Sequence, residues 1–499
     1  MKDTLPARVR FAPSPTGRFH IGSARTALYD YVYSRKTNGQ FILRIEDTDQ
    51  KRFDPTAEAE IMDSLKWLGI QWNEGPDIGG PFAPYRQSER LDIYLDLIQE
   101  LIDRDYAYYC FCTPERLNRV RQEQQKRKEP PRYDGLCRRL DPGEAFSRVE
   151  DGESHVVRFK TPKEGKTTAV DFLRGPITVD NATIDDYILL KSNGIPVYHL
   201  AAMADDHLME ITHVTRGSEW IPTFPLHVLI YQAFEWDQPV WIHLSLFLNP
   251  TGKGKLSKRH AVDPKSGIKS VYTLDLKEMG YIPEGVNNWT AMMGWAYDDH
   301  TEIFTMEDLI DKFSLEKLSS SPAAVNFSKL DHFNGIHLRQ LSQEELANRV
   351  RPFFEDSGYE VDDEKLILII PIIQERIRTL EEAVEMAGFF FEEEVRPEPN
   401  ELIGKNMSAA ESAAAAERAA NVIRDLPSMN HDIVDPLLRD LASELGLKAG
   451  QLFGILRVAV TGQKVSPPLF ESMEIIGKST VLSRIENAID ILRELATTE

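Results

Sequence analysis

Cysteine and long apolar runs are both scarce in this chain. Only three cysteines occur among 499 residues, too few for a disulfide framework. No uninterrupted stretch reaches the length of about 18 apolar residues that a membrane-spanning helix needs. The amino terminus, MKDTLPARVRFAPSP, also lacks an apolar run followed by a small-residue cleavage site. These absences argue against a secreted disulfide-rich domain and a membrane span, and they favour the reducing cytoplasm.

Positive charge is also in short supply. The chain has 58 Lys and Arg against 79 Asp and Glu, a formal net charge of −21. This balance argues against a protein that covers nucleic acid with a basic surface. Net charge is an average, however, and residues 116–139 hold nine Lys and Arg. A local basic surface on an acidic protein is therefore compatible with the sequence.

Strand and helix patterns alternate near the start of the chain. Residues 8–12 are rich in strand formers and lead into the loop PSPTG. Residues 20–36 repeat apolar side chains with a helical period, and FILRI at 41–45 predicts a second strand. Further helical patterns follow at 56–68 and 88–104. This β-loop-α-β unit favours a parallel sheet that binds ligands at the carboxyl ends of its strands.

Length and changes of composition predict several domains, because 499 residues exceed one hydrophobic core. After about residue 105 the sequence becomes basic and then strand-like up to about 190, which indicates an inserted module. WIHLSLFLN at 241–249 predicts a strand that leads into a Lys-rich loop. Beyond about residue 330, long helical periods at 365–388, 408–426 and 479–496 predict an all-α carboxyl third.

The tetrapeptide HIGS at 20–23 stands where a Gly-containing loop enters a helix. A helix start offers unpaired backbone N–H groups and the positive end of the helix dipole, which suit a phosphate group. His20 would lie beside the phosphates. Gly22 would leave room for a nucleotide to approach the backbone.

A second candidate phosphate contact is KLSKR at 255–259, inside the loop NPTGKGKLSKRH. Lys255 and Lys258 place two cations three positions apart in a segment rich in Gly and polar residues, suited to contacts with phosphates. Together, HIGS and KLSKR resemble the paired signatures of class I aminoacyl-tRNA synthetases.

The surrounding motifs resemble one family of that class, the bacterial type of glutamyl-tRNA synthetase. They are RFAPSPTGRFHIG (10–22), RIEDTD (44–49), FAPYRQSER (82–90), YHLA (198–201), DDHL (205–208) and R-x-x-EW (216–220). The likeness is strongest over residues 8–260, and in the carboxyl third it rests on element type and length. One departure is Ala202, where some relatives carry an amide side chain.

The resemblance implies an α/β fold: a Rossmann-type parallel-sheet catalytic domain with an inserted α+β acceptor-binding module, followed by all-α anticodon-binding domains. The corresponding ranges are 1–105 and 193–260 for the two catalytic halves and 106–192 for the inserted module. A stem-contact region at 261–335 and two helical anticodon-binding subdomains at 336–390 and 391–499 complete the chain.

The chemistry of glutamate asks for two cations and an anion, because glutamate has two carboxylates and one ammonium. Arg10, Arg216 and Glu46 could supply them, and the resemblance adds Ala12, Ser14 and Tyr198 to the glutamate site. It also implies that ATP contacts His20, Gly22, Glu219, Phe247, Lys255, Ser257 and Lys258, with His20, Gly22, Lys255 and Lys258 acting in catalysis. Asp49 and Arg376, the latter on a predicted helix ERIRTLEEA, are candidate tRNA contacts.

The implied reaction is ATP-dependent ligation of L-glutamate to tRNA(Glu) through glutamyl-adenylate, with Mg²⁺ on the triphosphate. Such transfer depends on positioning and fixed positive charge, so no nucleophilic Ser or Cys is expected. The family suggests a monomer. An alternative is a form that also glutamylates tRNA(Gln).

All three cysteines, Cys110, Cys112 and Cys137, fall in the predicted module. Their C-x-C…C spacing resembles a zinc site of some family members. The fourth ligand is missing, since Arg138 and Arg139 stand where a His might follow, so the sequence does not favour zinc.

Other functions fit the motifs less well. A glutaminyl-tRNA synthetase has β-barrels where this chain has helical patterns, and a truncated relative that glutamylates a tRNA base lacks the carboxyl third. An RNA-binding regulator without catalysis is disfavoured by the intact HIGS and KLSKR. A nucleotidyltransferase that does not use tRNA leaves residues 330–499 without a role.

Overall fold

The computed structural model describes residues 6–256 and 268–497 of the chain. The chain forms two compact units. The first comprises Met1–Asp275 and Val286–Phe327, and the second comprises Leu276–Gly285 and Ser328–Glu499.

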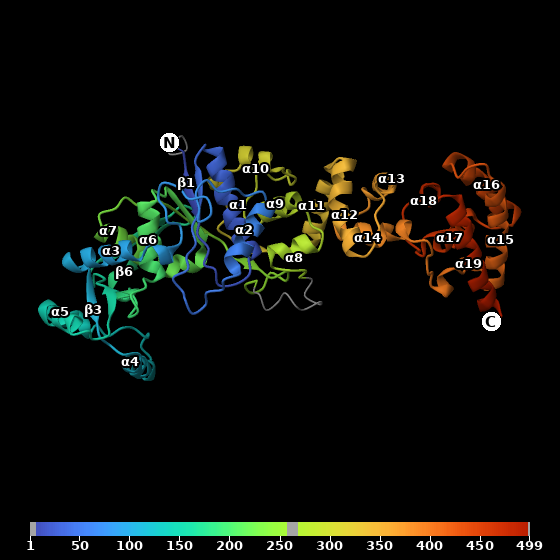
Figure 1. Ribbon diagram of the computed structural model, residues 1–499. Coiled ribbons are helices and arrows are strands. Elements are labelled where there is room, and N and C mark those ends of the chain that lie inside the picture. The colour runs from blue at the N-terminus through green and yellow to red at the C-terminus, as the bar shows by residue number, and fades with distance from the viewer. Residues whose placement is uncertain (1–5, 257–267, 498–499) are drawn as a thin grey trace. The chain divides into compact units, whose positions relative to one another are not determined.

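A six-stranded sheet with the order β2-β1-β8-β9-β5-β6 forms the centre of the first unit (Figure 1). Adjacent strands are parallel except for the antiparallel pair β5 and β6. The strand order changes direction between β1 and β8, and ligands of such sheets bind at this position beyond the carboxyl ends of the strands. The strands are β1 (Arg8–Phe11), β2 (Gln40–Leu43), β5 (Lys166–Asp171), β6 (Gly175–Asp180), β8 (His213–Gly217) and β9 (Val240–Leu244).

Helices that are buried along most of their length accompany the sheet. They are α1 (Ile21–Lys36), α6 (Tyr198–Leu208) and α7 (Phe224–Ala233). Other elements outside residues 106–192 are α2 (Ala57–Trp67), α3 (Leu91–Asp103), α8 (Thr273–Glu278), α9 (Pro283–Met292), α10 (Met306–Lys312), and the short parallel pair β10 (Phe247–Leu248) and β11 (Ala323–Ala324). The strand predicted at 241–249 is therefore interrupted after Leu244.

The segment 106–192, predicted as an inserted module, contributes to two sheets. Strands β3 (Ala107–Cys110), β4 (Val156–Phe159) and β7 (Ile188–Leu190) form a separate antiparallel sheet, accompanied by α4 (Pro114–Lys126) and α5 (Pro142–Glu150). The hairpin β5–β6 instead joins the central sheet, where Asp171 pairs with Trp241.

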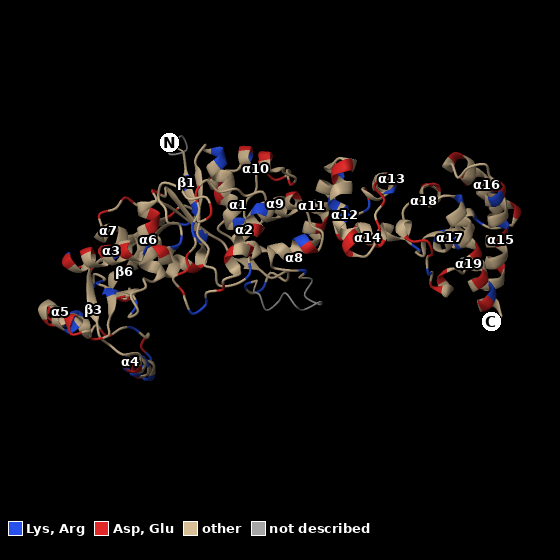
Figure 2. Cartoon of the chain, viewed as in Figure 1, with Lys and Arg blue, Asp and Glu red and all other residues tan. Residues whose placement is uncertain are grey.

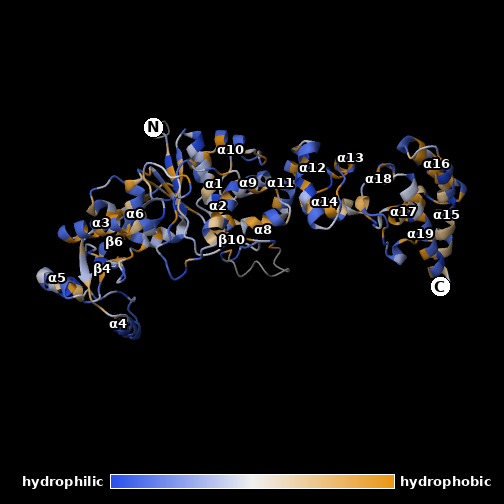
Figure 3. Ribbon diagram, viewed as in Figure 1, coloured by the Kyte–Doolittle hydropathy of each residue, from blue (hydrophilic) through white to orange (hydrophobic). Residues whose placement is uncertain are grey.

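Helix α4 is the most polar element of this segment. None of its side chains is buried, and its ribbon is hydrophilic in Figure 3. It carries Arg116, Arg119 and Arg121 among the basic residues drawn in Figure 2. The basic stretch predicted from the sequence thus lies on an exposed helix and its flanks.

The second unit is helical, with two apolar cores among its described residues. One core includes Ile282 and extends from Leu338 to Val395, and the other extends from Leu402 to Leu492. Its helices are α11 (Phe327–Gln340), α12 (Gln343–Asp356), α13 (Asp363–Ile373), α14 (Leu380–Ala387), α15 (Ala409–Asp425), α16 (His431–Glu444), α17 (Ala449–Thr461), α18 (Leu469–Ile476) and α19 (Lys478–Ala496). The predicted fold class, a parallel α/β unit followed by an all-α carboxyl third, is confirmed.

The single helix predicted at 365–388 is wrong, because two helices, α13 and α14, occupy this range. Buried Ile373, Ile377 and Leu380 follow a helical spacing and hide the break. Thr379 ends the interruption by capping α14, with its hydroxyl accepting the backbone N–H of Glu382 at 3.3 Å. Arg376 consequently lies in an exposed turn and not on a helix.

Among the described residues, no helix is both long and apolar enough to cross a membrane.

Candidate active site

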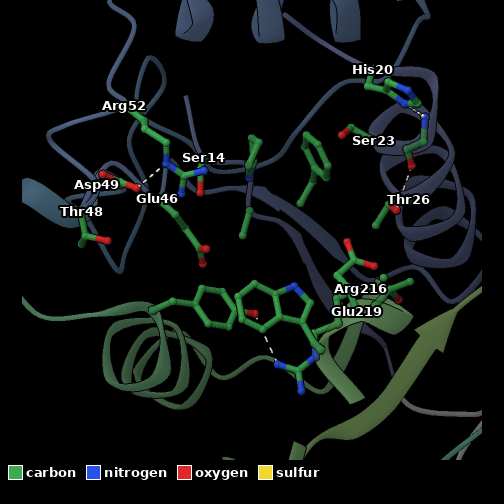
Figure 4. Close-up of a pocket in the computed structure, with 18 of the residues that line it drawn as sticks. Ser14, His20, Ser23, Thr26, Glu46, Thr48, Asp49, Arg52, Arg216 and Glu219 are labelled. Atoms are coloured by element: carbon green, nitrogen blue, oxygen red, sulfur yellow. Dashed lines mark hydrogen bonds and ion pairs between the residues drawn. The ribbon is translucent and has the colours of Figure 1, made fainter. Parts of the chain in front are cut away.

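A cavity of about 990 Å³ lies in the first unit, where β1 and β8 end. Figure 4 shows His20, Ser23 and Thr26 on one side of it and Glu46, Thr48 and Asp49 on the other. Among its lining residues are Arg10, Ala12, Ser14, His20, Gly22, Glu46, Asp49, Tyr198, Arg216, Glu219, Phe247 and Lys255. The structure therefore brings together every predicted site residue that it describes in this unit.

The start of α1 forms one wall of the cavity. His20 is the N-cap of the helix, and its Nδ1 accepts the backbone N–H of Gly22 at 2.9 Å. A Cβ atom at Gly22 would meet His20 Nδ1 at 3.3 Å and Phe247 Cδ2 at 3.9 Å. The helix start thus orients the His20 ring, and the absent side chain at Gly22 leaves the space in front of the backbone open.

The Lys-rich loop reaches the same cavity through a tight turn after β10. Asn249 accepts hydrogen bonds from the backbone of Thr251 and Lys253. Gly252 and Gly254 take positive φ angles of 73° and 81°, which side chains other than Gly adopt rarely. Lys255 thereby comes back opposite Leu248. The predicted ATP contacts Ser257 and Lys258 lie outside the described residues.

Arg10 and Glu46 belong to one buried network of charges. Arg10 Nε donates to Asp206 Oδ1 at 2.8 Å, and its NH2 group donates to Asp206 Oδ2 at 3.3 Å. Arg44 lies 2.8 Å from Asp206 and 3.0 Å from Glu46. Burial raises the pKa of Glu46, and the charge of Arg44 opposes that rise. The charge of Arg10 is therefore already balanced by Asp206, which the sequence did not reveal.

Arg216 has a different environment. Its guanidinium is buried and donates to three neutral groups: Tyr198 Oη at 3.3 Å, His227 Nδ1 at 2.9 Å and His243 Nε2 at 3.0 Å. No carboxylate of the described residues forms an ion pair with it. Tyr198 is held in turn by stacking on Trp220, with ring centroids 3.8 Å apart. Arg216 thus brings an unbalanced positive charge to the cavity.

The remaining predicted contacts lie nearer to solvent or outside the cavity. Ser14 and Glu219 are exposed, and Asp49 accepts a hydrogen bond from Arg52 at 2.6 Å. Ala202, the departure from some relatives, is fully buried in α6.

Arg376 belongs to the second unit and acts electrostatically on Arg457. The pKa of Arg457 is lowered by burial first and by the charge of Arg376 second. Arg457 also lines a cavity of about 330 Å³ together with Lys405, Lys464 and glycines of α17. The sequence did not single out Arg457, because an Arg in a helical period looks like any exposed helix residue.

The three cysteines lie together in the small sheet module. The Sγ atoms of Cys110, Cys112 and Cys137 all lie within 4.8 Å of one another. The hydroxyl of Tyr133 contacts Cys110 Sγ at 3.4 Å and Cys112 Sγ at 3.6 Å. A hydrogen bond from Cys137 is the chief cause of the lowered pKa of Cys110. Tyr133, which the sequence analysis overlooked, is thus a fourth polar group at this cluster.

Two further site residues belong to recognisable motifs, but the sequence alone indicates no role for them. Asp206 stands in DDHL, and Trp220 stands in R-x-x-EW. His227 and His243 lie in apolar segments, and their chemistry becomes visible only through their contacts with Arg216.

Comparison with known proteins gives a consistent result over nearly the whole chain. Residues 6–332 match the family described as "tRNA synthetases class I (E and Q), catalytic domain", and residues 345–489 match an "Anticodon binding domain". A glutamate–tRNA ligase of Dehalococcoides mccartyi is 44% identical over 497 residues, covering 99% of each chain. One of Roseiflexus sp. is 45% identical over 494 residues, covering 97% of this chain and 96% of that protein.

Solved structures agree with these relatives. The crystal structure of a glutamate tRNA ligase from Elizabethkingia meningosepticum, in complex with its amino acid, has a TM-score of 0.87 to this chain at 38% identity. The match covers 97% of this chain and 99% of that one.

Proposed function

The chain belongs to the glutamate–tRNA ligases, a family of class I aminoacyl-tRNA synthetases, and on this premise we propose that its reaction takes place in the cavity of the first unit. The enzyme joins L-glutamate to tRNA(Glu) and consumes ATP. One observation carries the assignment of the site: two stretches far apart in sequence, at His20 and at Lys255, line one cavity with Arg10, Glu46 and Arg216.

We infer that the nucleotide lies against the start of α1. Gly22 leaves the space for it, Phe247 lies beside Gly22, and Lys255 is the described lysine of the Lys-rich loop that lines the cavity. His20, Lys255 and the sequence-predicted Ser257 and Lys258 would contact the phosphates, with Glu219 near the adenosine. Mg²⁺ would arrive on the triphosphate and add positive charge there, because this ion is usually held by substrate phosphates and few protein ligands.

The amino acid would lie deeper, between the two charge environments. Arg216 suits the side-chain carboxylate of glutamate, because it is a buried cation without an anionic partner among the described residues. Glu46 suits the ammonium group of glutamate. Burial disfavours the charged form of Glu46, and an ion pair with the ammonium would stabilise that form. Arg10, Ala12, Ser14 and Tyr198 would complete the pocket.

The reaction has two steps. The α-carboxylate of glutamate attacks the α-phosphorus of ATP and pyrophosphate leaves. A hydroxyl of the terminal ribose of tRNA then attacks the glutamyl carbonyl, and AMP leaves. Both steps gain most from fixed geometry and from positive charge where negative charge develops.

For tRNA we propose three contact regions. Asp49 lies in the cavity lining, where the acceptor end would enter. The exposed basic helix α4 offers a surface for phosphates. Arg376 and Arg457 form a pair of neighbouring cations in the second unit, both within residues 345–489 that match the anticodon-binding family, and Arg is well suited to read a base edge.

The cysteine cluster is a candidate structural metal site. Three thiols and the Tyr133 hydroxyl form a set of four donors, the number that a closed zinc site uses. Metal analysis of the purified protein, with Cys112→Ser as the matched variant, tests whether zinc is bound through these groups.

A charging assay tests the proposed function. Labelled glutamate, ATP and purified tRNA(Glu) should yield glutamyl-tRNA, and Arg216→Gln should lose most of this activity. Arg35→Gln is the control, because Arg35 belongs to the same unit and binds Asn73 and Gln71 outside the cavity. Wild-type charging by Arg216→Gln would contradict the placement of glutamate.

The same assay with tRNA(Gln) tests the wider specificity, which none of the comparisons supports. The monomeric state and the cytoplasmic location stay predictions.

A further inference from the structure

Arg216, on β8, is held by side chains from three other elements. Its Nε, NH1 and NH2 groups donate to His243 of β9, Tyr198 of α6 and His227 of α7. A guanidinium has five N–H donors, so these contacts leave two N–H groups for a substrate. All three acceptors are uncharged groups, which orient the guanidinium without neutralising it.

The contact with His243 requires one particular tautomer. The Nε of Arg216 is always a donor, so Nε2 of His243 must be the acceptor at 3.0 Å. The proton then lies on Nδ1, which is 2.8 Å from Asp171 Oδ2. Asp171 also accepts the backbone N–H of His243 at 3.0 Å and that of Arg174 at 3.0 Å. The fully buried carboxylate of β5 therefore fixes the imidazole that orients Arg216.

The contact with His227 is built in the same way. NH2 of Arg216 donates to Nδ1 at 2.9 Å, so the proton of His227 lies on Nε2. That proton points to Nδ1 of His199, which is 2.9 Å away. Both imidazoles are neutral at physiological pH. Burial first, and the positive charge of Arg216 second, lower the pKa of His199 to about 4 and hold the pKa of His227 well below its ordinary value.

We propose that His243 and His227 are positioning residues, which hold Arg216 with two N–H groups directed at the side-chain carboxylate of glutamate. Asp171 and His199 fix their tautomers. This inference rests on the proposed function and deepens it, because it assigns the preference for glutamate over the uncharged, similarly shaped glutamine to the orientation of one buried cation. Asp171 gives the β5–β6 hairpin a direct part in the amino-acid site.

The test compares two substitutions at one position. His243→Gln keeps an acceptor for Arg216 and a donor for Asp171, whereas His243→Leu keeps neither. Pyrophosphate exchange, with tRNA(Glu) present, gives KM for glutamate and for ATP and the ratio of kcat/KM for glutamate over glutamine. Circular dichroism and ATP binding show that each variant is folded.

We expect His243→Leu to raise KM for glutamate about tenfold or more, as a buried donor loses its acceptor, and to lower the glutamate preference by a similar factor. KM for ATP should stay within about twofold of the wild-type value, and His243→Gln should restore most of the loss. His227→Leu should show the same loss as His243→Leu, and His227→Gln should restore most of it, as His243→Gln does.

Three outcomes would overturn the proposal. A folded His243→Leu with wild-type KM for glutamate would show that the contact does not matter. Equal increases of KM for glutamate and ATP would show general damage to the cavity. If His243→Leu does not fold, a folded His243→Gln with strongly raised KM for glutamate is the contradicting result. A wild-type enzyme without glutamate-dependent exchange would instead refute the proposed function.

Discussion

The backbone N–H of Gly22 donates to Nδ1 of His20 at 2.9 Å, so the first turn of α1 and the imidazole fix one another. Nδ1 is thereby an acceptor, and the proton of a neutral ring lies on Nε2. One local contact thus sets both the orientation and the hydrogen-bonding character of the predicted phosphate contact.

Gly22→Ala should separate stability from catalysis. Alanine favours a helix over glycine by roughly 1 kcal/mol, so the fold should be kept. The added Cβ would lie 3.3 Å from His20 Nδ1 and fill space in front of Phe247, so adenylate formation should fall about tenfold or more. Thermal unfolding and pyrophosphate exchange measure the two effects. Full exchange activity would mean that the nucleotide does not use this space.

Lys258→Ala, in the part of the loop outside the described residues, should lower adenylate formation by two or more orders of magnitude, or about 3 kcal/mol of lost transition-state stabilisation. Glutamate affinity should stay nearly unchanged, because Lys258 is expected at the phosphates. Pyrophosphate exchange at saturating glutamate is the measurement. An exchange rate close to that of the wild type would remove Lys258 from the catalytic step.

Asp206→Asn should destabilise the first unit by about 3–5 kcal/mol, because it leaves buried Arg10 without a balancing charge and removes one of the carboxylates that pair with Arg44. Burial raises the pKa of Asp206, but the two arginines outweigh it and the pKa is lowered. The stability from this ionisation is therefore present above the ordinary carboxyl pKa and is lost as pH falls through the lowered value. Thermal unfolding should show the loss as a lower Tm for Asp206→Asn, whereas the exposed control Asp103→Asn should leave Tm unchanged.

Asp30→Asn should stabilise the protein increasingly as pH rises. Burial raises the pKa of Asp30 to about 8, and its Oδ2 has no hydrogen-bond partner among the described residues. The folded state therefore holds a proton that the unfolded state has lost, so wild-type stability falls from about pH 4 up to pH 8. The difference in Tm between variant and wild type should widen from pH 5 to 8, unlike that of the exposed control Asp63→Asn. A constant difference would contradict the raised pKa.

Arg376→Ala should raise KM for tRNA about tenfold, a typical cost of losing a base-edge contact, and leave KM for glutamate unchanged. Arg396→Ala is a matched control, since Arg396 is an exposed arginine of the same unit. Steady-state charging with varied tRNA distinguishes the two. Equal effects of both substitutions would indicate only a general contribution of positive charge.

Local patterns explain why much of the catalytic unit could be predicted. Strand β1, helix α1 and strand β2 begin and end within two residues of the predicted ranges, because each is a short element with its own apolar pattern and turn residues. The break between α13 and α14 escaped prediction because the buried side chains at Ile373, Ile377 and Leu380 continue the helical period across it. The capping residue Thr379 is the local signal that could have revealed it.

The sequence by itself determined which chemistry is available: a histidine and a glycine at a helix start, lysines in a Gly-rich loop, and arginines near both. Those properties reside in residue type and local backbone, so they can be read along the chain. Only the tertiary structure decided how the charges are balanced. Arg10 and Arg216 look equivalent in the sequence, yet Asp206 lies 2.8 Å from the first, whereas neutral histidines surround the second. Electrostatic interactions depend on distance and burial, and both are set by residues far apart in the chain.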